Sequence, residues 1–275
     1  MTDEITGGRY YEGQPDLSKV AISDQRRATR RSGKYQGKPT VRVTFAGCNL
    51  ICGDPNGWET KVQDDMTPDG DGATWVCSAI EEWRDPKSLW TPEDLVEEWK
   101  ERGIIARLDG EFMLTLTGGE PLITDRQDDL TILLDRLYNE LEYYPTVEIH
   151  TNGTFEPKRR LRSYVNHFTV SPKLQNSGMP ESKRINSEAL RRFNQIAERG
   201  DPDSWDAEFQ FVFSERKDGE EIRQICRKHE LAPENVAVVP ADGLRRDEDC
   251  VEAAKDLCVR QGFTFRPRLG GLTDT

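Results

Sequence analysis

The chain lacks several features that would place it in common protein classes. No apolar run approaches the roughly 20 residues that span a bilayer, which argues against a transmembrane protein. The first residues are acidic and have no apolar core segment, so no signal peptide is predicted and we expect a cytoplasmic protein. Lys and Arg total 38 against 50 Asp and Glu, and this deficit of positive charge disfavours direct nucleic-acid binding.

Histidine is also scarce, with only His150, His167 and His229 in the chain. Each stands alone, without a second histidine at the spacing of a metal-binding pair, so a histidine-based metal site is not predicted. A lone histidine is more often a structural residue.

What the sequence does contain is an alternation of strand and helix patterns over 275 residues. We predict one domain over residues 1–275, with a polar segment at 1–39 whose Arg26, Arg27, Arg30 and Arg31 form a solvated charged face. The alternation predicts a parallel sheet, open or rolled into a partial barrel, with functional loops at the carboxyl ends of the strands. The predicted strands are 40–45, 112–116, 146–150, 168–170, 208–213, 236–239 and 263–265; the predicted helices are 91–103, 128–141, 159–164, 187–199, 220–230 and 248–261.

The six cysteines fall into two groups. Cys226, Cys250 and Cys258 lie in helical patterns, where a free cysteine usually packs as a small apolar residue. Cys48, Cys52 and Cys77 lie in a long loop after the first strand, and three thiolates from one loop point to zinc or to an iron–sulfur cluster. Structural zinc generally takes four protein ligands, and no fourth is evident, so iron–sulfur is favoured. Zinc and incidental cysteines remain the alternatives.

Three further polar motifs follow successive predicted strands. Residues 117–121 read Thr-Gly-Gly-Glu-Pro, residues 151–154 read Thr-Asn-Gly-Thr, and residues 171–173 read Ser-Pro-Lys. Glycines allow the backbone to approach a small molecule closely, and Glu120 has the charge to hold an ammonium group. A glycine-rich turn closed by proline is the plainer interpretation of the first motif alone. Four consecutive strands that each end in such a motif favour a functional site.

Together these motifs resemble the radical S-adenosylmethionine (SAM) superfamily, whose fold is a partial (β/α)6 barrel. Within it, the chain resembles the 7-carboxy-7-deazaguanine synthase family over about residues 36–270, through residues 46–50 (Ala-Gly-Cys-Asn-Leu) and the three motifs above. Residues 174–178 and 240–243 add to the resemblance. It implies a 4Fe–4S cluster on Cys48, Cys52 and Cys77, and SAM held by Gly118, Gly119, Glu120, Thr151, Asn152, Ser171 and Lys173.

The chain departs from that family at several positions. The superfamily usually places three and then two residues between its cysteines, whereas here 24 residues separate Cys52 from Cys77, so we interpret 53–76 as an insertion in the cluster loop. The family's threonine that helps to hold Mg²⁺ is Ala79, and its glutamate before Thr-Asn-Gly is His150. Its substrate arginine, four residues before the first cysteine, is Thr44. Arg42 and Arg268 are therefore the candidate partners of a substrate carboxylate.

The resemblance implies a carbon–nitrogen lyase that converts 6-carboxy-5,6,7,8-tetrahydropterin to 7-carboxy-7-deazaguanine with loss of ammonia, for 7-deazaguanine (queuosine or archaeosine type) nucleosides of tRNA or DNA. It also implies a flavodoxin- or ferredoxin-type electron donor and a homodimer. The altered substrate motifs leave open another radical SAM enzyme with a different small-molecule substrate. A non-catalytic zinc or structural protein is the alternative from a different class.

Overall fold

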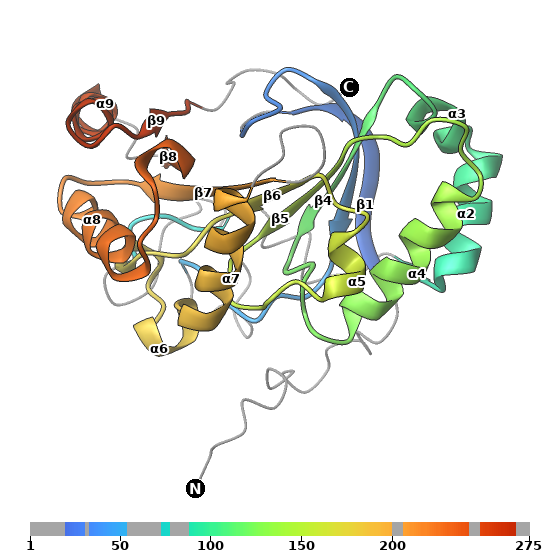
Figure 1. The fold of residues 1–275 in the computed structure, drawn as a ribbon, viewed down its shortest axis with the longest axis horizontal. Coiled ribbons are helices and arrows are strands. Elements are labelled where there is room, and N and C mark those ends of the chain that lie inside the picture. Colours follow the sequence, from blue (N-terminus) through green and yellow to red (C-terminus); the bar gives the residue numbers. More distant parts are fainter. Residues whose placement is uncertain are drawn as a thin grey trace, which may run out of the picture.

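A curved sheet of nine strands forms the centre of the computed structural model, which describes residues 20–30, 33–53, 73–77, 88–199, 206–241 and 248–267 (Figure 1). The strand order is β3-β1-β2-β4-β5-β6-β7-β8-β9. From β2 to β9 every neighbouring pair is parallel, while β1 pairs antiparallel with both β2 and β3. The strands are β1 (Val20–Thr29), β2 (Pro39–Phe45), β3 (Ser88–Trp90), β4 (Met113–Gly118), β5 (Val147–Thr151), β6 (His167–Val170), β7 (Asp206–Phe213), β8 (Val236–Pro240) and β9 (Thr264–Phe265).

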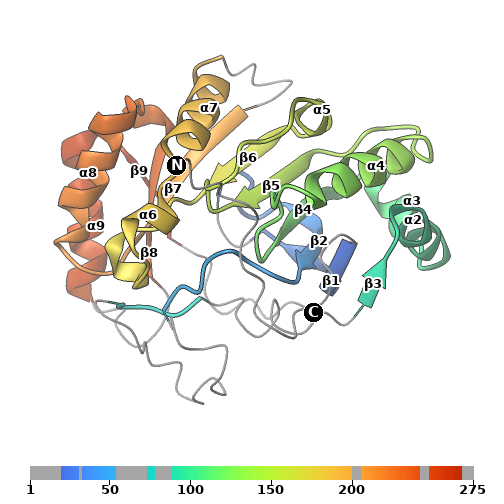
Figure 2. The ribbon, with the colours of Figure 1, turned by 90° about the horizontal axis from the view of Figure 1, so that it is seen from below.

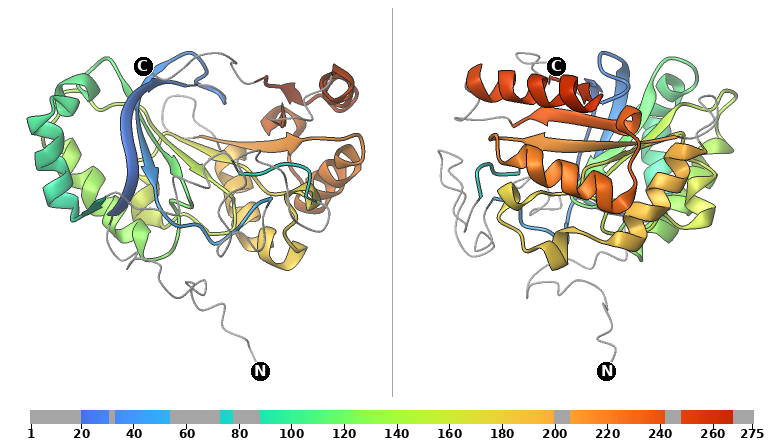
Figure 3. Two further views of the ribbon diagram at one scale, coloured as in Figure 1. Left: turned by 180° about the vertical axis from the view of Figure 1, so that it is seen from behind. Right: turned by 60° about the vertical axis from the view of Figure 1, so that its left-hand side comes forward.

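Helices connect the parallel strands and lie along the outer side of the curved sheet (Figure 2). Their pairing with β2, β4, β5, β6, β7 and β8 gives the six strand–helix units of a partial (β/α)6 barrel, which confirms the predicted fold class. Figure 3 shows α8 and α9 at the same end of the sheet, where α8 packs on β7 and α9 on β8. The helices are α2 (Pro92–Glu101), α3 (Ile104–Leu108), α4 (Arg126–Tyr138), α5 (Arg159–Arg162), α6 (Glu181–Arg184), α7 (Ser187–Glu198), α8 (Asp218–His229) and α9 (Glu248–Gln261), with short 3-10 turns η1 (Gln175–Ser177) and η2 (Pro233–Asn235).

The hydrophobic core lies between the sheet and these helices. Alternate residues of β5 illustrate how the sheet divides its faces: Val147 and Ile149 are buried in the core, whereas Glu148 and His150 face the other way, into the barrel. The barrel side is therefore polar, and polar groups on it require partners or a ligand. No helix within the described ranges is long and apolar enough to cross a membrane.

Two expectations for the N-terminal part were wrong. Residues 20–29 form β1, although the segment is polar and contains Asp24, a residue type disfavoured in strands, because antiparallel pairing with β2 holds them in place. Arg30, expected on a solvated face, is buried and pairs with Glu148. Residues 1–19, Arg31 and most of the predicted insertion lie outside the described residues.

Candidate active site

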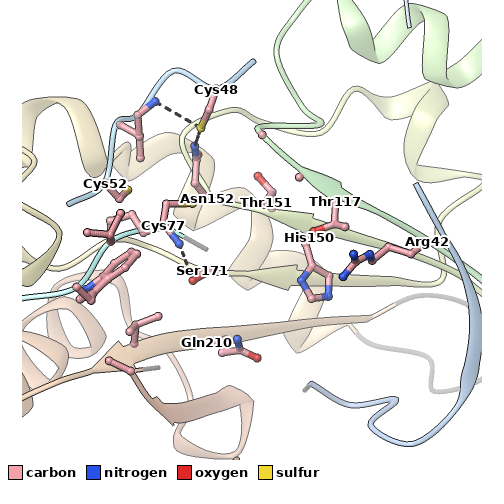
Figure 4. Close-up of a pocket in the computed structure, with 18 of the residues that line it drawn as sticks. Arg42, Cys48, Cys52, Cys77, Thr117, His150, Thr151, Asn152, Ser171 and Gln210 are labelled. Carbon is pink, nitrogen blue, oxygen red and sulfur yellow. Dashed lines mark hydrogen bonds between the residues drawn. The ribbon is translucent and has the colours of Figure 1, made fainter. Parts of the chain in front are cut away.

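One pocket at the carboxyl ends of the parallel strands gathers most of the residues singled out from the sequence (Figure 4). Its volume of about 310 Å³ is in the range of small-molecule sites. Most of the residues that line it follow or end β2, β4, β5, β6, β7 and β8, as the strand–helix alternation predicts, while Arg42 and Gln210 lie within β2 and β7. They include Arg42, Cys48, Cys52, Cys77, Gly118, Gly119, Thr151, Asn152, Ser171 and Lys173.

The three cysteines reach this pocket from two segments. Cys48 and Cys52 lie in the loop after β2, and Cys77 lies in residues 73–77. Burial raises the pKa of the Cys48 thiol to about 12 and also raises the pKa of Cys52, because a thiolate is poorly solvated there. Iron or another cation bound to these sulfurs would supply the missing positive charge.

The arrangement of the thiols fits a cluster. In the described part of the chain, no three His, Cys, Asp or Glu side chains converge on a single ion position. The three thiols instead line the walls of a shared pocket, as a multi-iron cluster requires, and thiolates are the ligands that hold such clusters.

Although 24 residues separate Cys52 from Cys77 in the sequence, hydrogen bonds hold the two ends of this stretch together. The Cys77 N–H donates to the carbonyl oxygen of Cys52 at 3.1 Å, and Gly53 N–H donates to Ser177 O at 2.8 Å. A Cβ at Gly53 would lie 2.3 Å from the carbonyl oxygen of Trp75, so only glycine allows this approach. Cys52 and Cys77 are therefore neighbours in space despite their separation in sequence.

The Gly119 and Glu120 positions of the Gly-Gly-Glu motif contact other loops of the protein. A Cβ at Gly119 would lie 1.9 Å from Gly47 O, so this glycine permits close packing of the loops after β2 and β4. Glu120, expected beside an ammonium group, is fully buried: its carboxylate accepts from the Thr151 hydroxyl at 2.8 Å and from the Asn152 and Leu122 N–H groups. In this structure it positions the Thr-Asn-Gly loop, and it does not line the pocket.

Asn152 links that loop to the first cysteine. Its Nδ2 donates to Asn49 Oδ1 at 2.8 Å and lies 3.9 Å from the Cys48 sulfur. After the neighbouring strand β6, Lys173 Nζ donates to Ser171 Oγ at 3.0 Å and lies 5.7 Å from the centre of the Trp75 ring. This lysine brings a positive charge to the wall that carries Cys77.

At the other end of the pocket, a buried polar network meets Arg42. Arg30 Nε lies 2.7 Å from Glu148 Oε2, and a second nitrogen of Arg30 lies 2.6 Å from His150 Nε2. The same His150 nitrogen also lies 3.0 Å from Glu148 Oε1; because arginine only donates and a carboxylate only accepts, this nitrogen can serve one of the two contacts at a time. Burial, followed by the charge of Arg30, lowers the pKa of His150. Figure 4 shows Arg42 and His150 on this side of the pocket.

Several lining residues were not identified as site candidates from the sequence. Thr117 and His150 belong to quoted motifs and so carried a signal; Arg30 belongs to a charge run and Gln210 to a strand pattern, and neither indicated a site. Gln210 is 5% exposed, and among the described residues its Oε1 has no hydrogen-bond partner. Arg268 and Ala79 lie outside the described residues.

The fold and the pocket define a radical SAM-type barrel, and the same architecture occurs in QueE from Escherichia coli. That crystal structure matches 92% of this chain and 95% of its own at a TM-score of 0.59 and 20% identity. No family model matches the chain.

Curated relatives identify the family. A 7-carboxy-7-deazaguanine synthase from Pyrobaculum aerophilum is 30% identical over 236 residues, 85% of each chain. One from Halobacterium salinarum is 26% identical over 279 residues, 96% of this chain and 94% of its own. The chain belongs to the 7-carboxy-7-deazaguanine synthase family, a family of radical SAM lyases that use a 4Fe–4S cluster and SAM.

Proposed function

We propose that this chain converts 6-carboxy-5,6,7,8-tetrahydropterin to 7-carboxy-7-deazaguanine, with release of ammonia. The observation that carries the proposal is the single pocket that contains three thiols at one end and a cationic, hydrogen-bonding wall at the other. When bound, the cluster and SAM supply the 5′-deoxyadenosyl radical that abstracts hydrogen from the substrate.

The roles proposed for the cofactor end follow from position and charge. Cys48, Cys52 and Cys77 hold three irons through their thiolates. The backbone at Gly118 and Gly119 contacts the amino end of SAM, while Thr151, Asn152, Ser171 and Lys173 bind its other polar groups. Glu120 acts indirectly, because its carboxylate fixes the Thr151 hydroxyl and the Asn152 backbone.

The substrate end is assigned to Arg42 and Arg268, with Arg42 as the pocket residue whose guanidinium matches a carboxylate. The buried network of Arg30, Glu148 and His150 supports this wall. The proposal extends to a small one-electron donor of the flavodoxin or ferredoxin type, to a cytoplasmic location and to a homodimer.

The test is anaerobic reconstitution with iron and sulfide, followed by an assay of 5′-deoxyadenosine and of 7-carboxy-7-deazaguanine. Wild type should form both products and Cys77→Ala should form neither. Cys226→Ala is the matched control, because this buried cysteine lies on α8 and does not line the pocket. Cleavage of SAM without turnover of the pterin would overturn the proposed substrate. A protein that binds zinc but no iron–sulfur cluster would overturn the proposed class of reaction.

A further inference from the structure

The segment that carries Cys77 is attached to the barrel chiefly through one buried residue, Asn176, beside a contact of the Thr74 hydroxyl with Ser214 and a backbone bond from Cys77 to Cys52. This residue is 1% exposed and lies in the 3-10 turn η1 after the Ser-Pro-Lys motif. Its Oδ1 accepts from the Trp75 indole N–H at 2.9 Å, and its backbone oxygen accepts from Thr74 N–H at 2.9 Å. Both partners precede Cys77 by only two or three residues.

The other half of the Asn176 amide is bound to the barrel wall. Its Nδ2 donates to the backbone oxygen of Val212 at 2.9 Å and to Asp218 Oδ2 at 2.9 Å. Asp218 is itself 2% exposed and accepts from Ser214 N–H at 2.7 Å, so the anchor is rigid. One side chain thus connects β7 and the start of α8 to residues 73–77.

The chemistry of these partners fixes the orientation of the amide. An indole N–H only donates, and a backbone carbonyl only accepts, so Oδ1 must face Trp75 and Nδ2 must face Val212. An aspartate at this position would place a carboxylate oxygen against the Val212 carbonyl and the Asp218 carboxylate. The position therefore requires an amide, although aspartate has the same shape.

We propose that Asn176 is the positioning residue for the third cluster ligand, holding Cys77 beside Cys52 whether or not the cluster is bound. The proposal rests on the proposed function for the identity of the cluster. It explains how a ligand that follows a gap of 24 residues reaches the pocket: the ligand's position depends on residues 174–178 and not on the chain between the two cysteines.

The first measurement uses the reduced, iron-free full-length chain. Alkylation of Cys77 by iodoacetamide is followed by peptide mass spectrometry, with the buried Cys226 as internal reference. Asn176→Asp and Trp75→Phe should each raise the Cys77 rate about tenfold, the factor that corresponds to loss of about 1.4 kcal/mol from one buried hydrogen bond. The double variant should exceed the faster single variant by little, since Trp75→Phe removes the bond from the indole to Asn176 and Asn176→Asp removes the bonds from Asn176 to Val212 and Asp218, and both belong to one continuous connection.

The matched control is Asn194→Asp, a buried asparagine on α7 that contacts Glu198 and Glu230 and not residues 73–77. It should leave the Cys77 rate at the wild-type value. A Cys77 rate that is unchanged in Asn176→Asp, or raised equally in Asn194→Asp, would overturn the proposal.

The second measurement is the rate of iron loss from the reconstituted protein to a chelator. Asn176→Asp should lose iron several-fold faster than wild type and than Asn194→Asp. If Asn176→Asp speeds alkylation of Cys77 but leaves the rate of iron loss unchanged, the proposed role of Asn176 in holding the cluster ligand is overturned. A wild-type chain that takes up no iron would overturn the proposed function, while the alkylation ratio would still decide whether Asn176 positions Cys77.

Discussion

Arg30 and Glu148 form an ion pair inside the barrel, with Arg30 Nε 2.7 Å from Glu148 Oε2. The two residues are 118 positions apart, and the glutamate is fully buried. The pair therefore joins the chain after β1 to the middle of β5 on the polar side of the sheet.

Glu148→Gln should destabilise the fold by about 3–5 kcal/mol, because it leaves the Arg30 charge buried without its partner. Urea unfolding of the full chain measures this. Glu97→Gln is the control, since Glu97 pairs with Lys100 on the surface and should contribute less than about 1 kcal/mol. Equal effects of the two changes would contradict the structural role of the pair.

His150 should make the protein less stable as the solution becomes acidic. Burial, then Arg30 and His167, lower its pKa below the ordinary histidine value of 6.5, while Glu148 opposes them. Below that pH the unfolded chain binds more protons than the folded chain, so the free energy of unfolding falls with pH. His150→Gln should reduce this fall between about pH 7 and pH 5. An unaltered pH profile would show that folding does not lower the pKa of His150.

Gly119→Ala should destabilise the protein by at least about 2 kcal/mol, because the added carbon would overlap Gly47 O and force the two loops apart. Gly219→Ala, on α8, is the control: its Cβ would meet Leu257 at 3.4 Å, an ordinary contact, and alanine favours a helix by about 0.5–1 kcal/mol. Thermal unfolding compares them. Similar melting temperatures would contradict the close packing of the loops.

Gln210→Leu should weaken substrate binding without lowering the free energy of unfolding. Removal of a buried carbonyl without a partner costs the fold nothing, so the unfolding free energy should stay equal or rise. If the amide contacts substrate, KM for the pterin should rise about tenfold, the equivalent of one hydrogen bond. A variant that loses stability and keeps its KM would assign Gln210 to the fold alone.

Replacement of residues 54–72 by a short Gly-Ser linker should leave cluster binding intact. The hydrogen bonds described for residues 73–77 are made to Cys52, Asn176 and Ser214, all outside the replaced stretch. Iron and sulfide per chain, measured after reconstitution, should equal the wild-type values. Loss of the cluster would show that the replaced residues themselves help to hold it.

Sequence patterns predicted the regular elements well and the contacts between them poorly. Helix α9 begins and ends at the predicted residues 248 and 261, and Thr91 caps α2 through Asp94 N–H, since both signals are local. Strand β1 was missed because its charged residues are stabilised by pairing with β2, which local propensity does not contain.

The same limit applies to the site. The motifs after successive strands predicted one shared pocket because parallel topology brings those ends together. The inward turn of Glu120 and the burial of Arg30 depend on partners that are distant in sequence, namely Thr151 and Glu148. The sequence immediately around Glu120 and Arg30 does not indicate these partners.

The backbone hydrogen bond between Cys52 and Cys77 closes the loop between them at its base. In this chain the positions of the sulfurs therefore do not depend on the number of residues between the cysteines, whereas in most cysteine motifs the two are linked. The number of residues between ligands can change in such a chain while the sulfurs keep their places. Length variation at this point is therefore nearly neutral for the site, and it leaves room for added sequence to acquire another role. A search that demands a fixed interval between the cysteines would overlook proteins built in this way.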